Sequence, residues 1–299
     1  MRGSALAGGS ERTGAPSGRA RDGAVAALAA LLRDRPVVVL SGAGCSTESG
    51  IPDYRGEGSP RRKRSPIQYG EFVRSAEARR RYWARSAVGW PRMSEARPNP
   101  GHGALARLED GGVVRGVITQ NVDGLHQAAG SGRVLELHGS LAGVCCLGCG
   151  EVEPRPALQE RLLALNPGWG DRSAEMAPDG DAELPARAVA EFRVPVCLCC
   201  GGVLKPDVVF FGESVPRERV ERAWELFREG EALLVVGSSL AVYSGRRFTQ
   251  RAEKEGIPVA VVNLGPTRAD EVARVRVPGR SGEVLPRLAD AMLGEAVAA

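Results

Sequence analysis

Short segments of apolar and often β-branched residues alternate with helix-like patterns along most of this chain. Apolar residues fill nearly every position of these segments, which is typical of strands buried on both faces of a parallel sheet. Strands are expected at residues 36–40, 114–119, 134–137, 232–236 and 259–264. Helices are expected at residues 24–34, 104–109, 123–129, 216–228, 245–255 and 283–293. The alternation predicts an α/β fold built on a doubly wound parallel sheet.

The composition sets the broad class of the protein. Of the 299 residues, 43% are hydrophobic and 25% charged, as in an ordinary soluble globular protein. The formal charge of +4 comes mainly from arginine, because lysine occurs only at positions 63, 205 and 254, and it gives little support for a nucleic-acid partner. No apolar run approaches the roughly 18 residues that span a bilayer, and the first two dozen residues lack the apolar core of a signal peptide. We therefore expect a cytoplasmic protein with no membrane partner and no specific nucleic-acid partner.

Irregular stretches separate the predicted sheet from the rest of the chain. Residues 1–23 are mostly glycine, arginine, alanine and serine, which predicts a disordered leader. Residues 155–193 are expected to form loops and short helices. The predicted organisation is a Rossmann-like nucleotide-binding domain with an inserted smaller domain, which contains a helical module and a zinc-binding module. The large domain takes residues 24–56, 104–139 and 208–299, and the small one takes residues 57–103 and 140–207.

A glycine-rich turn follows the first predicted strand. Gly42 and Gly44 can bring bare backbone N–H groups up to a phosphate, and a helix beginning just after them would add the positive end of its dipole. The third glycine of a dinucleotide fingerprint is missing, because Thr47 stands there, and residues 61–64 are basic where a ribose-binding acid is expected. These departures argue against an NAD-dependent dehydrogenase. The turn continues to Asp53 and Arg55, which suggest a loop that folds over a charged ligand.

Polar residues and glycines follow each of the five predicted strands. The carboxyl ends of parallel strands meet at one edge of the sheet, so these turns are expected to converge on a nucleotide site. They are Gly42-Ala43-Gly44, Gln120-Asn121-Val122-Asp123, His138-Gly139, Gly237-Ser238-Ser239 and Asn263-Leu264-Gly265. Asp123 or Ser238 alone would be interpreted as a helix cap. Of the three histidines only His138 lies directly at a strand end, which makes it the candidate general base. Packing or surface roles suffice for His126, on a helix, and for His102, in a loop.

Six of the seven cysteines fall in two clusters, each with one C-x-x-C unit followed by glycine. Two such units in an intracellular chain are typical of a structural zinc ion with four thiolate ligands, and they argue against a redox disulfide. The predicted ligands are Cys146, Cys149, Cys197 and Cys200, with one zinc per chain. Cys145 and Cys199 could each replace a neighbour, although the two-residue spacing favours the first set. Cys45, in the glycine turn, is expected to be a small buried residue rather than a nucleophile.

Taken together, these motifs resemble the sirtuins, the NAD-dependent protein-lysine deacylases, from about residue 24 to the C-terminus. The resemblance is carried by Gly50-Ile51-Pro52-Asp53-Tyr54-Arg55, Thr119-Gln120-Asn121-Val122-Asp123, Leu137-His138-Gly139, the paired cysteines and Gly237-Ser238-Ser239. Within the family the chain looks most like the mitochondrial and bacterial class II members. That similarity rests on residues 64–68, 81–85 and 88–91. Tyr54 stands where most of the family has phenylalanine, and Ser281 where related members often have cysteine.

The resemblance implies an enzyme that transfers the acyl group of an acyl-lysine to ADP-ribose and releases nicotinamide. His138 would be the general base, with Asn121 beside it in the catalytic site. The residues implied to bind NAD are Gly42, Ala43, Gly44, Ser46, Thr47, Ile51, Pro52, Asp53, Tyr54, Arg55, Gln120, Asn121, Val122, Asp123, Gly237, Ser238, Ser239, Asn263, Leu264, Gly265 and Ser281. The implied substrate segment, along which an extended acyl-lysine peptide would add as a strand, is Val208, Val209, Phe210, Phe211, Gly212 and Glu213.

Other readings remain beside the deacylase. Mono-ADP-ribosyl transfer would use the same pocket, and a non-catalytic zinc-knuckle binding module is an alternative of another class. A binding module has no reason to keep a histidine at a strand end, and the chain has little lysine and few aromatic residues with which to bind nucleic acid. The segment 208–213 could be a core strand, and the basic run 61–64 a solvated loop or a receptor for an acidic acyl chain or protein. The motifs leave the acyl group, the target proteins and the oligomeric state open.

Overall fold

The structure is a computed structural model that describes residues 18–54, 66–172, 184 and 189–294. Arg55, the basic run 61–64 and the first 17 residues of the expected leader lie outside the described residues. Within the described part, helix α1 spans Gly18–Leu32, so the chain is helical from residue 18 rather than from residue 24. No helix of the described residues is long and apolar enough to cross a membrane.

Six parallel strands form the central sheet, in the order β3-β2-β1-β7-β8-β9. Strands β1 (Val37–Ser41), β2 (Val114–Thr119), β3 (Val134–Glu136), β7 (Ala232–Val236) and β8 (Val259–Val262) agree with the expected strands to within two residues. Strand β9 (Ala273–Val277) was not expected, because it lies at the sheet edge and only Val277 is fully buried. The strand order reverses between β1 and β7, which is where doubly wound sheets bind ligands.

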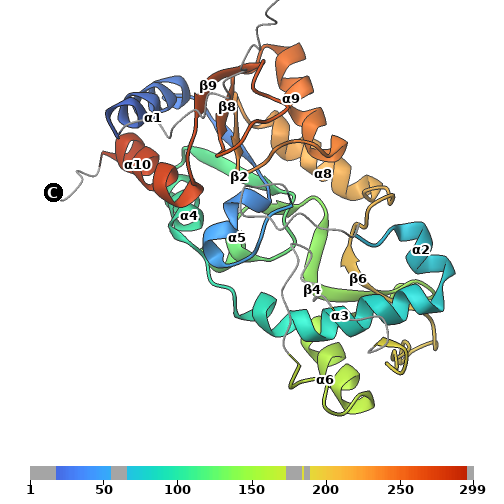
Figure 1. Cartoon of the computed structure of the whole chain (residues 1–299). Coiled ribbons are helices and arrows are strands. Elements are labelled where there is room, and N and C mark those ends of the chain that lie inside the picture. The colour runs from blue at the N-terminus through green and yellow to red at the C-terminus, as the bar shows by residue number, and fades with distance from the viewer. Residues whose placement is uncertain (1–17, 55–65, 173–183, 185–188, 295–299) are drawn as a thin grey trace, which may run out of the picture.

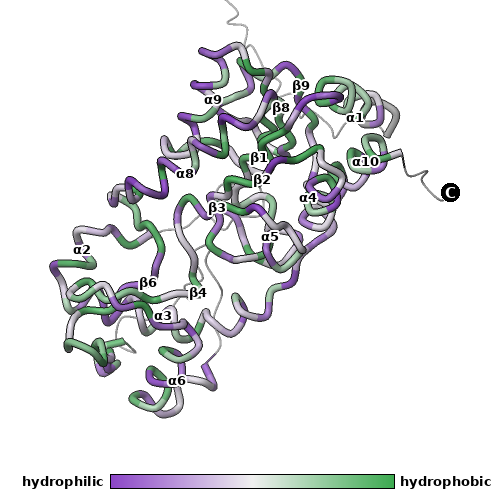
Figure 2. Tube along the Cα trace, turned by 180° about the vertical axis from the view of Figure 1, so that it is seen from behind, coloured by the Kyte–Doolittle hydropathy of each residue, from purple (hydrophilic) through white to green (hydrophobic). Residues whose placement is uncertain are grey.

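Helices cover both faces of the sheet (Figure 1). One face packs against α1, α4 (Pro100–Asp110) and α10 (Ser281–Leu293), and the other against α8 (Arg217–Arg228) and α9 (Tyr243–Glu255). The strands between them are apolar, and Figure 2 colours β1 and β8 green while much of α8 and α9 is purple. The burial of β1, β7 and β8 on both sides explains why the sequence predicts them well.

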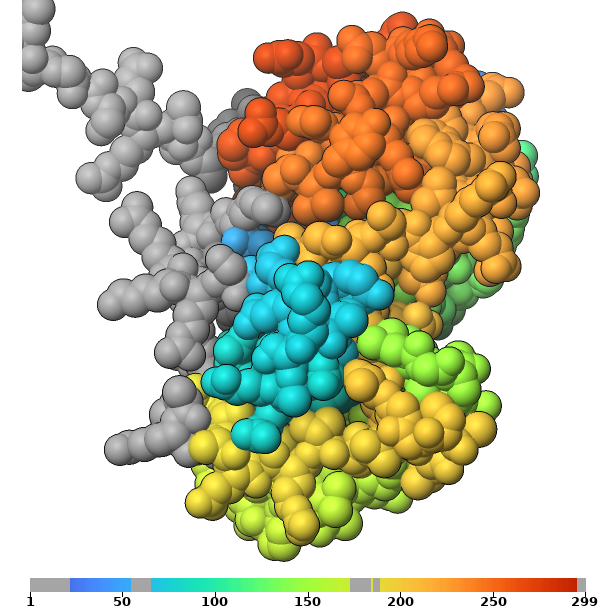
Figure 3. Space-filling model, turned by 90° about the vertical axis from the view of Figure 1, so that its right-hand side faces the viewer, coloured from blue at the N-terminus to red at the C-terminus, as the bar shows by residue number. Residues whose placement is uncertain are grey.

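A second, smaller part of the molecule is built on a three-stranded antiparallel sheet in the order β5-β4-β6. Strands β4 (Gly139–Cys146) and β6 (Leu204–Val208) pack with α2 (Tyr69–Arg74), α3 (Ala76–Glu95) and α6 (Arg155–Leu165) around one apolar cluster. Strand β5 (Val152–Pro154) pairs with β4 and contributes no residue to this cluster. The space-filling view shows this part below the sheet domain (Figure 3). The blue-green atoms of α2 and α3 form its upper portion, next to the orange atoms of the sheet domain. These elements were not predicted individually, because each buries only some of its residues.

Candidate functional site

The glycine turn after β1 lies against the turn after β7. The N–H of Gly44 donates to the carbonyl of Gly237 over 2.8 Å. A Cβ at Gly44 would stand 2.9 Å from that carbonyl oxygen, and one at Gly237, where φ is +60°, would stand 2.2 Å from the amide nitrogen of Cys45. Both glycines are therefore required by close approach of two backbones. The turn continues as two short 3-10 helices, Ala43–Cys45 and Thr47–Ser49, so the helix expected just after the glycines does not form.

Side chains from the end of β2 bond across the sheet edge to this turn. Asn121, which is buried, donates its amide to the carbonyl of Gly42 (3.1 Å) and to the hydroxyl of Ser46 (3.0 Å). The Ser46 hydroxyl donates in turn to Asp123 (2.7 Å). Gln120 reaches the turn after β7, where its amide donates to the hydroxyl of Ser238 (2.8 Å). These bonds join the strand ends after β1, β2 and β7, and His138 joins a fourth to them.

His138 follows β3 and bonds through both ring nitrogens. Nδ1 lies 2.9 Å from the carbonyl oxygen of Gln120, which can only accept, so Nδ1 carries the proton. Nε2 is then unprotonated and accepts from the hydroxyl of Ser244 at 2.8 Å. Burial lowers the pKa of His138 below its ordinary value of 6.5; the bond to Gln120 opposes the shift, and nearby Arg219 and Arg247 add to it. The imidazole is therefore neutral at pH 7, with its lone pair on Nε2.

Sequence reasoning missed Ser244 and Gly245, at the start of α9. Ser244 supplies the hydroxyl that meets His138. Gly245 lets the helix approach, because a Cβ there would stand 2.4 Å from the side-chain oxygen of Gln120. Gly245 was assigned only to a helix, and its position after a strand-end turn was the one signal that could have marked it.

The remaining predicted cofactor residues lie around the same edge with mixed contacts. Ile51 is buried, and the ring of Tyr54 meets that of Phe211 edge to face with centroids 6.0 Å apart. Ser281, at the start of α10, donates to the carbonyl of Cys45 (3.4 Å). Asn263 donates locally to the carbonyl of Gly265 rather than across the sheet edge. The other predicted members, found in the same turns, are Ala43, Thr47, Pro52, Asp53, Val122, Ser239 and Leu264.

The predicted substrate segment adjoins the candidate base directly. Val208 is the last residue of β6 and pairs with Gly139, and the N–H of Val209 donates to the carbonyl of His138 over 2.8 Å. Phe210 is buried against the rings of Phe72 and Tyr82. The rest of the segment, Phe211, Gly212 and Glu213, forms a turn in which φ of Gly212 is +78°. The segment is therefore part core strand and part turn, and its role in binding substrate stays a prediction.

The four predicted zinc ligands come together although two of them are separated from the others by almost fifty residues. Their sulfur atoms all lie within 4.8 Å of one another, with 3.5 Å between Cys146 and Cys200 and 3.7 Å between Cys149 and Cys197. Zinc–sulfur bonds of about 2.3 Å in a tetrahedron would put neighbouring sulfurs about 3.8 Å apart. Gly202 is needed here, because a Cβ would stand 2.9 Å from the sulfur of Cys146. The group fits a structural zinc ion.

A second buried group, Cys45, His102 and His126, lies behind the glycine turn. His102 belongs to the first turn of α4, so the loop position expected for it was wrong. Its Nδ1 accepts from the N–H of Asn99, so Nε2 carries the proton and points at the sulfur of Cys45 from 3.9 Å. Burial raises the pKa of Cys45 to about 12 and lowers that of His126 to about 3. This hydrogen bonding describes a neutral packed network rather than a metal site, in agreement with the packing roles expected.

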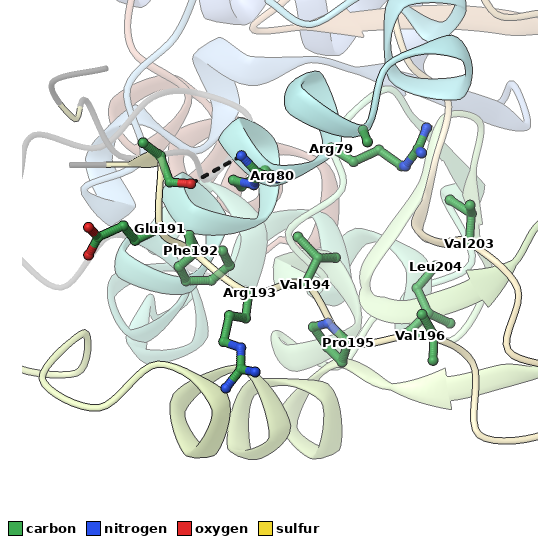
Figure 4. Close-up of a pocket in the computed structure, with 12 residues that line it drawn as sticks. Arg79, Arg80, Glu191, Phe192, Arg193, Val194, Pro195, Val196, Val203 and Leu204 are labelled. Atoms are coloured by element: carbon green, nitrogen blue, oxygen red, sulfur yellow. Dashed lines mark hydrogen bonds between the residues drawn. The ribbon is translucent and has the colours of Figure 1, made fainter. Parts of the chain in front are cut away.

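One hollow of the described surface lies away from the strand-end site. A cavity of about 460 Å³ opens between α3 and residues 190–196 of the small part, where Arg80 donates to the carbonyl of Ala190 (Figure 4). Val194, Pro195 and Leu204 are among its apolar lining residues. None of the lining residues is a predicted site residue, so the hollow does not mark the strand-end site.

Comparisons with known proteins agree on the family. Residues 42–244 match the model of the Sir2 family. NAD-dependent protein deacetylase 1 of Streptomyces coelicolor is 54% identical over 266 residues, which are 89% of this chain and 89% of that protein. The human mitochondrial NAD-dependent protein lipoamidase sirtuin-4 is 52% identical over 253 residues, 84% of this chain and 81% of that protein. A solved Sir2 structure with a p53 peptide and NAD+ has 31% identity and a TM-score of 0.71, covering 88% of this chain and 95% of its own. The resemblance predicted from the sequence is confirmed, and the chain belongs to the Sir2 family.

Proposed function

We propose that the chain is an NAD-dependent protein-lysine deacylase, which moves an acyl group from a lysine side chain to ADP-ribose and releases nicotinamide. The observation that carries the proposal is His138. Its imidazole is neutral, has its lone pair on Nε2, and lies at the same sheet edge as the glycine turn and next to Val209. The relatives named NAD-dependent deacetylase and lipoamidase support the reaction class.

The roles of the site residues follow from the groups that they offer. The turn Gly42-Ala43-Gly44 and the hydroxyl of Ser46 would hold the pyrophosphate of NAD, since bare N–H groups and hydroxyls bind phosphate. Asn121 and Asp123 would hold the nicotinamide end, and both are tied to Ser46. NAD supplies the glycosidic bond that is broken and the ribose that receives the acyl group. His138 would take a proton from a ribose hydroxyl at Nε2.

The four-cysteine group would hold one zinc ion with a structural role. Four thiolates complete a tetrahedron and leave no open position for a substrate, so no catalytic step runs through this metal. We propose the division of the chain given by the sequence, with the sheet domain for NAD and the smaller domain for the zinc ion. The cytoplasmic location and the lack of a specific nucleic-acid partner stay predictions.

The test compares the wild type with His138→Ala for nicotinamide release from NAD. Peptides carrying acetyl-, lipoyl-, succinyl- and longer acyl-lysines would be offered, with acetyl and lipoyl as the first candidates because of the relatives' activities. We expect His138→Ala to lose roughly 10²- to 10⁴-fold in kcat, the contribution of a general base, while keeping its zinc and its circular dichroism spectrum. Full turnover by His138→Ala would refute the role of this residue.

The pH profile gives a second measurement on the wild type. Because the pKa of His138 is held below 6.5, kcat/KM for NAD should be flat above pH 7 and fall tenfold per unit only at lower pH. A profile that falls with a midpoint above 7 would contradict a neutral base in the free enzyme.

A further inference from the structure

Lys205 is an unusual residue in this chain. Arginine is used for nearly every cation, and lysine occurs only at positions 63, 205 and 254. Lys254 is exposed on α9, whereas Lys205, on β6, is only 4% exposed. A buried ammonium group costs free energy unless it is paired and hydrogen-bonded, so its partners should explain why it is there.

The ammonium group of Lys205 meets three acceptors that converge on one point. It lies 3.0 Å from a carboxylate oxygen of Glu213, 2.5 Å from the carbonyl oxygen of Val208 and 3.4 Å from that of Pro206. The ring of Phe210 is 4.8 Å away. A compact group with three rotatable donors suits this arrangement, whereas the flat guanidinium fork of arginine would spread its donors.

The carboxylate of Glu213 links Lys205 to the backbone of the predicted substrate segment. The carboxylate oxygen that meets Lys205 also accepts from the N–H of Phe210 over 2.8 Å. The N–H of Glu213 closes the turn by donating to the carbonyl of Phe210 (3.0 Å). The Glu213 side chain is 20% exposed, so without Lys205 its charge would be drawn toward water and away from Phe210.

Residues 209–211 also form main-chain hydrogen bonds with the chain on either side of them. The N–H of Val209 donates to the carbonyl of His138, and the carbonyl of Phe211 accepts from the N–H of Tyr69. Lys205 therefore holds both ends of the stretch from Val208 to Phe210, the first directly and the second through Glu213. Val209, the middle residue of that stretch, bonds to the main-chain carbonyl of His138. The ion pair thus adds to the backbone bonds that hold residues 209–211 beside His138.

We propose that Lys205 and Glu213 are a positioning pair for the main chain of the acyl-lysine substrate. The inference rests on the proposed function: an extended peptide adds alongside residues 209–211, and the pair keeps that backbone in register with His138. Recognition of the residues flanking the acyl-lysine depends on the pair, whereas binding of NAD and of the acyl-lysine side chain does not.

The experiment compares two substrates that differ only in flanking main chain. One is an acetyl-lysine peptide of about a dozen residues, and the other is a single acetyl-lysine blocked at both ends. Lys205→Met keeps the length of the side chain without its charge, Lys205→Arg keeps the charge without the converging geometry, and Lys254→Met is the matched control on an exposed lysine. Nicotinamide release gives kcat and KM, and calorimetry gives the affinity for NAD.

We expect Lys205→Met to raise the KM of the peptide roughly tenfold or more, the worth of a hydrogen bond to a charged group. The KM of the single residue, the affinity for NAD and the behaviour of Lys254→Met should stay unchanged, and Lys205→Arg should not restore peptide recognition. An equal rise of KM for both substrates, or no rise for either, would overturn the proposal.

Two further measurements keep the result decisive. If Lys205→Met does not fold, Glu213→Gln replaces it, because the amide oxygen can still accept from Phe210 while the charge is gone; an unchanged peptide KM in Glu213→Gln counts against the pair. Fluorescence anisotropy of a labelled acetyl-lysine peptide reads binding directly. If the wild type binds the peptide more tightly than Lys205→Met but releases no nicotinamide, the positioning pair stands and the proposed function fails.

Discussion

The edge of the parallel sheet and the four-cysteine module are each stabilised by different interactions. At the sheet edge, turns from separate strands bond to one another directly, as Gly44 does to Gly237 and Asn121 to Ser46, above strands that are buried on both faces. The module has three short antiparallel strands, and it leaves Leu198 81% and Val152 58% exposed. The sheet is stabilised by burial, whereas the module depends on its thiolates and on the aromatic cluster beneath it.

The largest effect is expected from breaking the module. Cys146→Ser should lose about one equivalent of zinc and melt the module, because structural zinc contributes on the order of 10 kcal/mol to small sites of this kind. The parallel sheet should stay folded, since no cysteine ligand packs in its two apolar clusters. Metal analysis and tryptophan fluorescence check this.

The tryptophans allow the two regions to be followed separately. Trp83 and Trp169 pack in the small part and Trp224 packs in the sheet domain. In a Trp224→Phe background the fluorescence comes from the small part alone, so the Cys146→Ser change should alter it clearly. Zinc that remained bound to Cys146→Ser would contradict the ligand assignment.

A smaller effect is expected from separating the turns at the sheet edge. Gly237→Ala puts a Cβ 2.2 Å from the nitrogen of Cys45 at a φ of +60°, so the turns must move apart. We expect a loss of stability of about 2 kcal/mol and a larger loss of NAD affinity, measured by thermal unfolding and calorimetry. The control is Gly103→Ala, inside α4 with open space around its Cβ position, which should stabilise the helix by about 0.5–1 kcal/mol. Equal losses of NAD affinity in both variants would disprove the close-approach argument.

The smallest effect is a dependence of sheet-domain stability on pH. His126 has a pKa of about 3 when folded, against about 6.5 when unfolded, so the unfolded state takes up a proton first. The stability that neutral His126 contributes is fully present above pH 6.5 and is lost as the pH falls toward 3. The loss between pH 6.5 and 5, the window of the measurement, is about 1.6 kcal/mol. The stability difference between the wild type and His126→Gln, measured by urea unfolding, should therefore shrink between pH 6.5 and 5. A constant difference would show that folding does not lower the pKa of His126, and would contradict its burial as a neutral imidazole.

The strands β1, β7 and β8 could be predicted because burial on both faces leaves an apolar run in the sequence. The zinc ligands could be predicted because the C-x-x-C spacing is itself a property of metal-binding turns, and their sulfurs do meet. The edge strand β9 was missed although its residues alternate as Ala-Arg-Val-Arg-Val, because the expected strands were taken from apolar runs without alternation. The strands β4 and β5 of the module could not be predicted, since their polar and apolar residues follow no clear period.

The sequence by itself determined the alternating α/β fold, the family and the identity of the groups at the strand ends, because these depend on local runs and short spacings. Only the tertiary structure decided which groups meet. It brought Ser244 to Nε2 of His138, replaced the expected helix after Gly44 by two 3-10 turns, and converged Lys205 and Glu213 on the backbone of Phe210. Such contacts join residues far apart in the chain, or depend on the angle of approach of two backbones, and neither leaves a periodic signal in the sequence.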